Sequence, residues 1–153
     1  MRVSALKCLA LTRLPSVLCL HVQRRCFDPM TDEMTKTAQH IEFDEVLDLS
    51  PFVAFGGNGS TIFHPNRHSI AGNPTSAGID NVAVGLRSPI LYRLASIIEH
   101  HGNASRGHYV CYRQLPSGSQ NRSWYYCSDD MVVQVPWSRV RQAQAYMLFY
   151  EVI

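Results

Sequence analysis

The sequence has no pair of cysteines in a CxxC spacing, although five of its 153 residues are cysteines. CxxC pairs mark many structural zinc sites, so no such site is expected. An odd number of cysteines also fits poorly with a fully paired disulfide framework. We therefore predict free thiols in a reducing, intracellular compartment for Cys8, Cys19, Cys26, Cys111 and Cys127.

Long apolar runs and clusters of like charge are missing as well. No stretch approaches the roughly 18 consecutive apolar residues that a membrane-spanning helix needs, so no membrane span is predicted in this chain. Charged residues make up 17% of the chain and the net charge is +2. The bases are scattered rather than gathered in a stripe that could neutralise phosphates, so nucleic acid is not an expected partner.

Several histidines have spacings that metal sites use. His64 and His68 form one such pair, and His100, His101 and His108 form a looser group. Neither set has the cysteines or carboxylates that usually accompany histidine around zinc. We therefore predict no metal and no cofactor.

The N-terminal segment is basic, and its first acidic residue is Asp28. This composition is typical of a mitochondrial transit peptide. However, Pro15 interrupts any amphipathic helix, and residues 14–25 suit a strand. An imported or secreted protein, cut near residue 25 inside that strand, is the least favoured interpretation.

The first half of the chain mixes strands with long polar stretches. Residues 16–24 (SVLCLHVQR) have apolar side chains at consecutive positions, which predicts a strand buried on both faces. A polar loop is predicted at 27–39, and residues 41–49 fit either a strand or a helical turn. Residues 51–89 are rich in Gly, Asn, Ser and Pro, which predicts a long loop or insertion.

The second half favours strands, and the whole chain is interpreted as a single α+β unit, residues 1–153, with the insertion at 51–89. Aromatic and β-branched residues dominate this half. Strands are predicted at 91–99, 108–113, 123–128 and 145–153, with a short helix at 137–143.

A hairpin is expected where residues 115–121 (LPSGSQN) separate two predicted strands. If the hairpin is symmetric about Gly118, His108 faces Ser128. Directly opposite residues have Cβ atoms about 4.5 to 5.5 Å apart, which suits a hydrogen bond between a hydroxyl and an imidazole. A catalytic histidine needs such a partner to fix its tautomer and ring angle. A slip of one residue in the pairing would put the two on opposite faces.

The order and spacing of several motifs together resemble the histidine box of the ubiquitin-specific proteases. The motifs are YRL at 92–94, EHHG at 99–102, RGHYVCY at 106–112, WY at 124–125, SDD at 128–130 and AYMLFYE at 145–151. The segment LPSVLCLHVQR at 14–24 resembles the strand that precedes this box. The resemblance implies a papain-like cysteine protease fold, of which this chain would form only the antiparallel-sheet (palm) half.

The resemblance also implies roles for individual residues. His108 matches the catalytic histidine, and Ser128 stands where the family usually has an aspartate or asparagine that orients it. Asp129 matches a supporting acidic position, and the ubiquitin tail would lie beside Gly107 and Tyr109. The implied activity is thiol-dependent cleavage at the C-terminus of ubiquitin, with ubiquitin and ubiquitinated proteins as partners.

Two departures from the family pattern matter. Serine at the third triad position resembles the mitochondrial outer-membrane member, as does the sequence KCL at 7–9, which would place the protein on that membrane facing the cytosol. The block that carries the family's nucleophilic cysteine has no match here, so we expect the isolated chain to be inactive. The alternative is a non-catalytic ubiquitin-binding fragment or a truncated gene product.

Less specific interpretations stay open for the same residues. His108 could be an ordinary strand histidine, Ser128 a strand-end serine and Asp129 part of an acidic turn. Cys111 and Cys127 are interpreted as core thiols, because free cysteine packs as a small hydrophobe.

Overall fold

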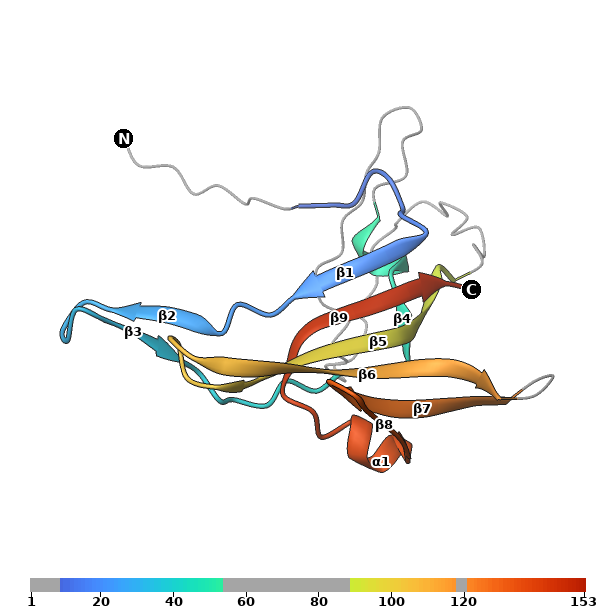
Figure 1. Cartoon of the computed structure of the whole chain (residues 1–153). Coiled ribbons are helices and arrows are strands. Elements are labelled where there is room, and N and C mark those ends of the chain that lie inside the picture. The colour runs from blue at the N-terminus through green and yellow to red at the C-terminus, as the bar shows by residue number, and fades with distance from the viewer. Residues whose placement is uncertain (1–8, 54–88, 118–120) are drawn as a thin grey trace, which may run out of the picture. The chain divides into compact units, whose positions relative to one another are not determined.

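The computed structural model describes residues 9–53, 89–117 and 121–153 (Figure 1). The chain divides into two compact units, Met1–Leu14 with Asp48–Ile90 and Pro15–Leu47 with Leu91–Ile153. All residues predicted to form the site lie in the second unit. The predicted insertion at 51–89 falls largely outside the described residues.

In the described part of the first unit, backbone hydrogen bonds gather around Leu49, which is 4% exposed. Its N–H donates to Ile90 O, and its carbonyl oxygen accepts the N–H of Phe52. A 3-10 helix, η1 (Ser50–Phe52), follows Leu49. The Ser50 hydroxyl donates to the Asp48 carboxylate and accepts the N–H of Ile90 at 2.9 Å. The first of these bonds is the main reason that the pKa of Asp48 is lowered.

The second unit contains a predominantly antiparallel sheet with little helix. The strand order is β1-β9-β5-β6-β7-β8, and β4 pairs with β5 as a branch. Apart from α1 (Trp137–Val140), no α-helix occurs in the described residues. The strands are β1 (Val17–His21), β4 (Val46–Asp48), β5 (Leu91–Gly102), β6 (Gly107–Ser117), β7 (Asn121–Ser128), β8 (Met131–Val135) and β9 (Ala145–Val152).

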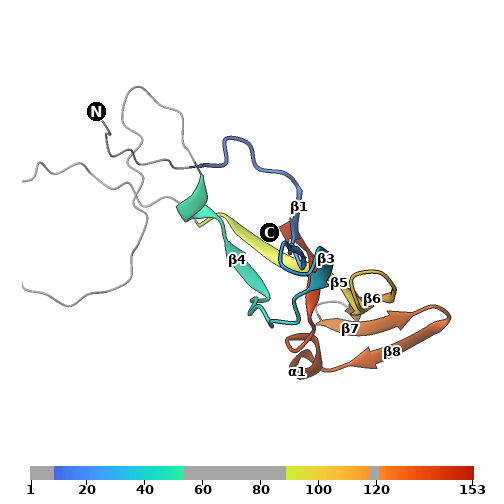
Figure 2. The same ribbon diagram turned by 90° about the vertical axis from the view of Figure 1, so that its left-hand side faces the viewer.

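The core lies on one face of this sheet, because side chains alternate along each strand. In β6, Val110 and Tyr112 are 3% and 4% exposed, whereas Arg113 points to solvent. The covering layer is α1 together with residues 40–45. Figure 2 shows α1 beside the β7–β8 hairpin.

Two residues of the segment 40–45, Glu45 and Asp44, hydrogen-bond to side chains of the sheet. Glu45 accepts a hydrogen bond from the Trp124 indole at 3.1 Å, and Asp44 O accepts one from the Tyr150 hydroxyl at 2.8 Å. Burial raises the pKa of Tyr150 to about 12, so the phenol remains a proton donor. The predicted antiparallel sheet and a short helix are both present. The α+β class itself is not specifically confirmed, because the described residues contain so little helix.

The predicted burial of β1 on both faces is wrong. Val17 is 51% exposed and Leu20 38%, and only Leu18 within the strand is half-buried. Among the described strands, β1 stands at the edge of the sheet, with β9 as its neighbour. A run of apolar residues indicated a strand correctly, but it could not indicate how many neighbours the strand has.

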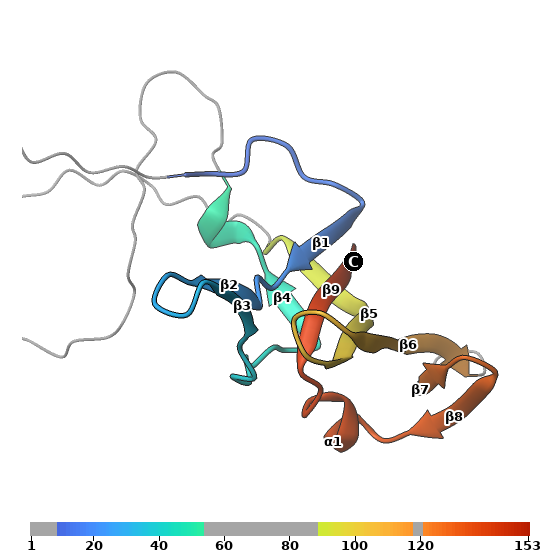
Figure 3. The ribbon, with the colours of Figure 1, turned by 60° about the vertical axis from the view of Figure 1, so that its left-hand side comes forward.

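The predicted polar loop at 27–39 is wrong as well, because most of it belongs to a hairpin of β2 (Arg25–Asp28) and β3 (Glu33–Lys36) (Figure 3). The turn contains Asp32 with φ 57°, a left-handed conformation that aspartate tolerates. Both strands are short and polar, so they carry no alternating apolar pattern. Of residues 41–49, only Val46–Asp48 form a strand, β4, and residues 41–45 are irregular.

Candidate active site on the β6–β7 hairpin

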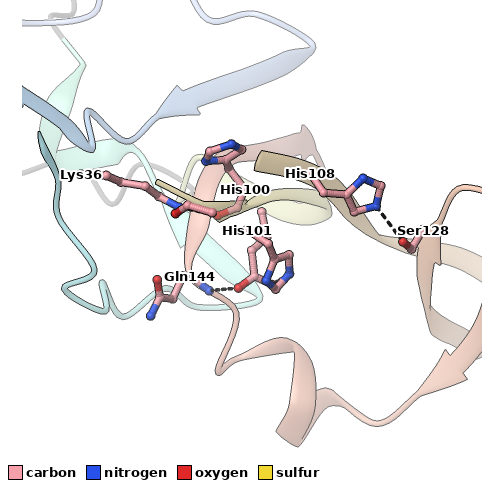
Figure 4. A network of polar contacts seen from close by, with 8 residues as sticks. Lys36, His100, His101, His108, Ser128 and Gln144 are labelled. Carbon is pink, nitrogen blue, oxygen red and sulfur yellow. Dashed lines mark hydrogen bonds and ion pairs between the residues drawn. The ribbon is translucent and has the colours of Figure 1, made fainter. Parts of the chain in front are cut away.

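His108 is the second residue of β6 and its side chain is 47% exposed. Positions 108, 110 and 112 alternate along β6, so the side chain of His108 lies on the same face of the strand as those of the buried residues Val110 and Tyr112. Unlike them, His108 is not covered by other side chains of the described residues. Its Nε2 lies 2.9 Å from the Ser128 hydroxyl at the end of β7 (Figure 4). The structure thus brings together the two residues that the sequence paired.

The hairpin register differs from the predicted one by two residues. Cys111 faces Cys127 in the ladder, whereas symmetry about Gly118 would have put it opposite Tyr125. A shift of two residues keeps side chains on the same face, unlike a shift of one. His108 therefore reaches Ser128 diagonally, which a long side chain can do. Gly118 itself lies outside the described residues.

Asp129 stands in the turn that joins β7 to β8. Ser128 pairs with Met131, so Asp129 and Asp130 form a two-residue turn, with Asp129 at φ 49°. Its carboxylate lies 3.6 Å from His108 Nε2 and is 80% exposed, so solvent weakens this ion pair. The residue is part of an acidic turn and also a neighbour of the imidazole.

Both polar neighbours of His108 approach the same ring nitrogen. If Nε2 carries the proton and donates it to Ser128 or Asp129, Nδ1 is left with a free lone pair. In the part of the chain that the structure describes, Nδ1 has no hydrogen-bond partner. The arrangement can therefore take up a proton at Nδ1 while the ring angle is held at Nε2.

Gly107 is required by packing within the chain. A Cβ on this residue would overlap His100 Nε2 and the backbone oxygen of His101. Tyr109, on the same face as His100, is 53% exposed, and its ring centroid lies 4.6 Å from that of His100. The small residue thus lets the His100 imidazole pack against the backbone that leads to His108.

The turn before His108 is held by hydrogen bonds. Gly102 has φ 119°, which favours glycine. The Asn103 side-chain oxygen accepts the N–H groups of Ser105 and Arg106 at 2.9 and 2.8 Å, and Asn103 N–H donates to Arg106 O at 2.9 Å. This turn sets the direction in which β6 leaves toward His108.

Lys36 contacts the backbone at the end of β5, a contact that the sequence analysis did not predict. Its ammonium group, at the end of β3, donates to His100 O at 2.5 Å and to Gly102 O at 3.1 Å (Figure 4). The β2–β3 hairpin is thereby fastened to the strand end that precedes the turn. Burial lowers the pKa of His100, and the charge of Lys36 adds to this effect.

A pocket of about 380 Å³ lies next to this contact and is lined partly by Lys36, Glu99 and His101. His101 is the Cα partner of His108 across the β5–β6 ladder. Its Nε2 lies 3.6 Å from the carboxylate of Glu99, which is 8% exposed and also accepts Gln144 N–H at 3.1 Å. His101 is thus turned toward Glu99, while His108 is turned toward Ser128.

Four of the five cysteines lie in the described residues. Cys19 and Cys26 lie in β1 and β2, and Cys111 and Cys127 pair with each other. No cysteine among the described residues makes a hydrogen bond with His108.

The predicted histidine pairs and the candidate membrane spans can be examined only in the described residues. His64 and His68 lie outside the described residues. Across residues 9–53, 89–117 and 121–153, no three His, Cys, Asp or Glu side chains gather in a way that could hold a metal ion. No helix in the same ranges is long and apolar enough to cross a membrane.

Comparison with known proteins finds similarity to several ubiquitin carboxyl-terminal hydrolases. The chain is 32% identical to ubiquitin carboxyl-terminal hydrolase 45 of Danio rerio over 97% of its length, and 27% identical to ubiquitin carboxyl-terminal hydrolase 30 of Xenopus tropicalis over 98%. It spans only 17% and 35% of these two relatives. Two differently numbered members match at similar identity, so the similarity does not single out one.

A solved structure has the same fold. The chain superimposes on the SAGA Ubp8/Sgf11/Sus1/Sgf73 DUB module bound to ubiquitin aldehyde with a TM-score of 0.68 and 25% identity, over 94% of this chain and 26% of the other. Residues 7–150 match the family described as ubiquitin carboxyl-terminal hydrolase. Because this match covers nearly the whole sequence, the chain belongs to the ubiquitin carboxyl-terminal hydrolase family.

Proposed function

We propose that this chain is the histidine-bearing, palm part of a cysteine-type deubiquitinase, which hydrolyses the bond at the C-terminus of ubiquitin. His108 acts as the general base, Ser128 orients it and Asp129 supports the imidazolium. The observation that carries this proposal is the 2.9 Å contact between His108 Nε2 and the Ser128 hydroxyl, which leaves Nδ1 free to take a thiol proton. The ubiquitin tail lies along Gly107 and Tyr109.

The thiol nucleophile comes from outside these 153 residues. This part of the proposal is supported by the position of the described cysteines, none of which makes a hydrogen bond with His108. The activity is intracellular. It would take place on the mitochondrial outer membrane, facing the cytosol, if the parent protein is the member with a Cys-His-Ser triad.

The test is a ubiquitin probe with an electrophilic C-terminus, applied to this chain alone and to a longer form that carries the nucleophile. Labelling of only the longer form, abolished by removal of its nucleophilic cysteine, supports the proposal. Labelling of the 153-residue chain would show that one of its own five cysteines reacts. Ubiquitin binding by both forms without labelling of either would favour the alternative, a non-catalytic ubiquitin-binding fragment.

Replacing Ser128 with aspartate is expected to raise kcat of the longer form by about fivefold. A carboxylate stabilises an imidazolium better than a hydroxyl does, by about 1 kcal/mol for a hydrogen bond to a charged group. Ser123→Asp, which adds the same charge to the same strand, serves as the control and should leave kcat unchanged. An unchanged kcat in Ser128→Asp would argue against a role of residue 128 in tuning the rate through the imidazolium.

A further inference from the structure

Two cysteines face each other beside the candidate site and have no part in the proposed chemistry. Cys111 in β6 and Cys127 in β7 are Cα partners in the antiparallel ladder. Directly opposite residues have Cβ atoms on one face, about 4.5 to 5.5 Å apart. Cys111 is three positions after His108 and therefore points to the other face of β6. Both cysteines are half-buried, so a small reagent can reach them.

The two thiols have apolar neighbours across the ladder and one nearby cation, Arg113 of β6. Ile98 of β5 faces Cys111 on one side, and Val132 of β8 faces Cys127 on the other. The Ser96 hydroxyl lies 3.2 Å from Cys111 Sγ. Among the described residues the pair belongs to no group of three or more His, Cys, Asp or Glu side chains that could hold a metal ion, so the chemistry argued for it is that of two adjacent thiols.

We propose that Cys111 and Cys127 are an oxidative modification site, at which a hydroperoxide forms a cross-strand disulfide that small thiols reduce again. With hydrogen peroxide, one thiolate attacks an oxygen, the O–O bond breaks, and a sulfenic acid and one water are formed. The second thiol attacks the sulfenic sulfur, an S–S bond replaces the S–O bond, and a second water leaves. Two thiols and one peroxide thus give one disulfide and two waters.

The ladder geometry permits this bond and makes it reversible. Opposite Cα atoms in an antiparallel pair are about 4.5 or 5.5 Å apart, and both values fall in the range of disulfides. The Cβ atoms of a disulfide, however, lie about 3.8 Å apart, so the strands must approach by about 1 Å. A strained disulfide has a higher reduction potential and is the kind that small thiols reduce.

The rate of oxidation should depend on pH. Burial raises the pKa of the Cys127 thiol, the neighbouring Cys111 sulfur raises it further, and the positive charge of Arg113 in β6 offsets only part of this rise. The thiolate is the reactive form, so a raised pKa means a smaller reactive fraction at neutral pH. We therefore expect the disulfide to form faster as the pH is increased above 7.

Formation of the disulfide is expected to change the geometry of the His108–Ser128 contact. Cys127 directly precedes Ser128, and the Cys111–Cys127 pair is the last one in the β6–β7 ladder before the His108–Ser128 hydrogen bond. A shift of about 1 Å between the strands would change this hydrogen bond. Oxidation should therefore move the imidazole NMR signals of His108. The modification site itself stands whether or not His108 is catalytic.

The test uses the full chain with Cys8→Ser, Cys19→Ser and Cys26→Ser, which leaves the pair as the only thiols. After treatment with hydrogen peroxide and alkylation, trypsin should release residues 107–113 and 123–139 as one linked species. Dithiothreitol should separate the two peptides. The matched control adds Tyr125→Cys and Cys127→Ser. Tyr125 faces Arg113 in the ladder, so the control has the same number of thiols with the second one displaced by two residues.

The outcomes separate clearly. Linkage in the native pair at least about tenfold faster than in the control supports the proposal, because the ladder holds only the native sulfurs together. Equal rates of linkage would overturn it, since they would mean that the register does not bring the thiols together. Recovery of only sulfinic or sulfonic acids, without a linked species, would overturn it too.

Discussion

Replacing His108 with alanine is expected to lower kcat of the nucleophile-bearing form by about 10²–10⁴-fold, the usual contribution of a general base. The imidazole is held at Nε2 by Ser128 at 2.9 Å, and Nδ1 is free to accept the thiol proton. Without the ring, the thiol must lose its proton to solvent. The measurement is the steady-state hydrolysis of a ubiquitin substrate with a fluorescent leaving group, with kcat and KM determined separately.

His101→Ala is the matched control for this experiment. His101 is the Cα partner of His108, and its side chain is similarly exposed, 54% against 47%. Its ring is turned toward Glu99 rather than Ser128. We expect kcat of the His101 variant to stay close to the original value. A comparable loss in both variants would contradict the role assigned to His108, because it would indicate a general disturbance of the two strands.

The pairing of His108 with Ser128 could be predicted from sequence because it depends on local features. Two β-forming segments flank a turn-rich stretch, and the alternation of side chains fixes which residues share a face. The register could not be predicted, because Gly118 marks a turn without determining the length of its loop. An error of two residues preserved the face, and so the pair was found from an incorrect register.

Features that depend on distant parts of the chain could not be predicted in the same way. The run VLCLH indicated a strand, but its exposure follows from its place at the sheet edge, which local sequence does not encode. The polar strands β2 and β3 have no apolar alternation to reveal them. β8 is different, because the acidic turn at 129–130 followed by MVVQV was a readable hairpin signal that the prediction missed.

Arg24 and Arg25 also show that local sequence does not determine which of two side chains is buried. The two are adjacent and chemically identical, yet Arg24 is 2% exposed and Arg25 is exposed. The guanidinium group of Arg24 donates to Ala145 O and Gln39 O at 2.8 Å and to Thr37 O at 3.3 Å. It therefore ties the segment after the β2–β3 hairpin to the start of β9.

Replacing Arg24 with alanine is expected to lower the free energy of unfolding by about 3–5 kcal/mol. A hydrogen bond from a charged donor contributes about 1.5–3 kcal/mol, and two of the three bonds at Arg24 are short. A typical domain has a total stability of about 5–15 kcal/mol, so the loss is a large fraction of it. The measurement is urea unfolding followed by the fluorescence of Trp124 and Trp137, both of which lie in the same unit of the chain.

Two further variants decide what the Arg24 effect means. Arg25→Ala removes an exposed guanidinium one residue away and should change the stability by no more than about 0.5 kcal/mol. Arg24→Met keeps most of the volume and removes only the donors, so a loss of at least about 2 kcal/mol would assign the effect to the unpaired carbonyls. If Arg24→Met were as stable as the original chain, cavity formation would explain the alanine result, because buried charges are costly and an apolar side chain can replace them. In that case β9 would be held near the hairpin by the backbone bond from Val22 N–H to Tyr146 O, and the hairpin itself by Lys36 at the end of β5, rather than by Arg24.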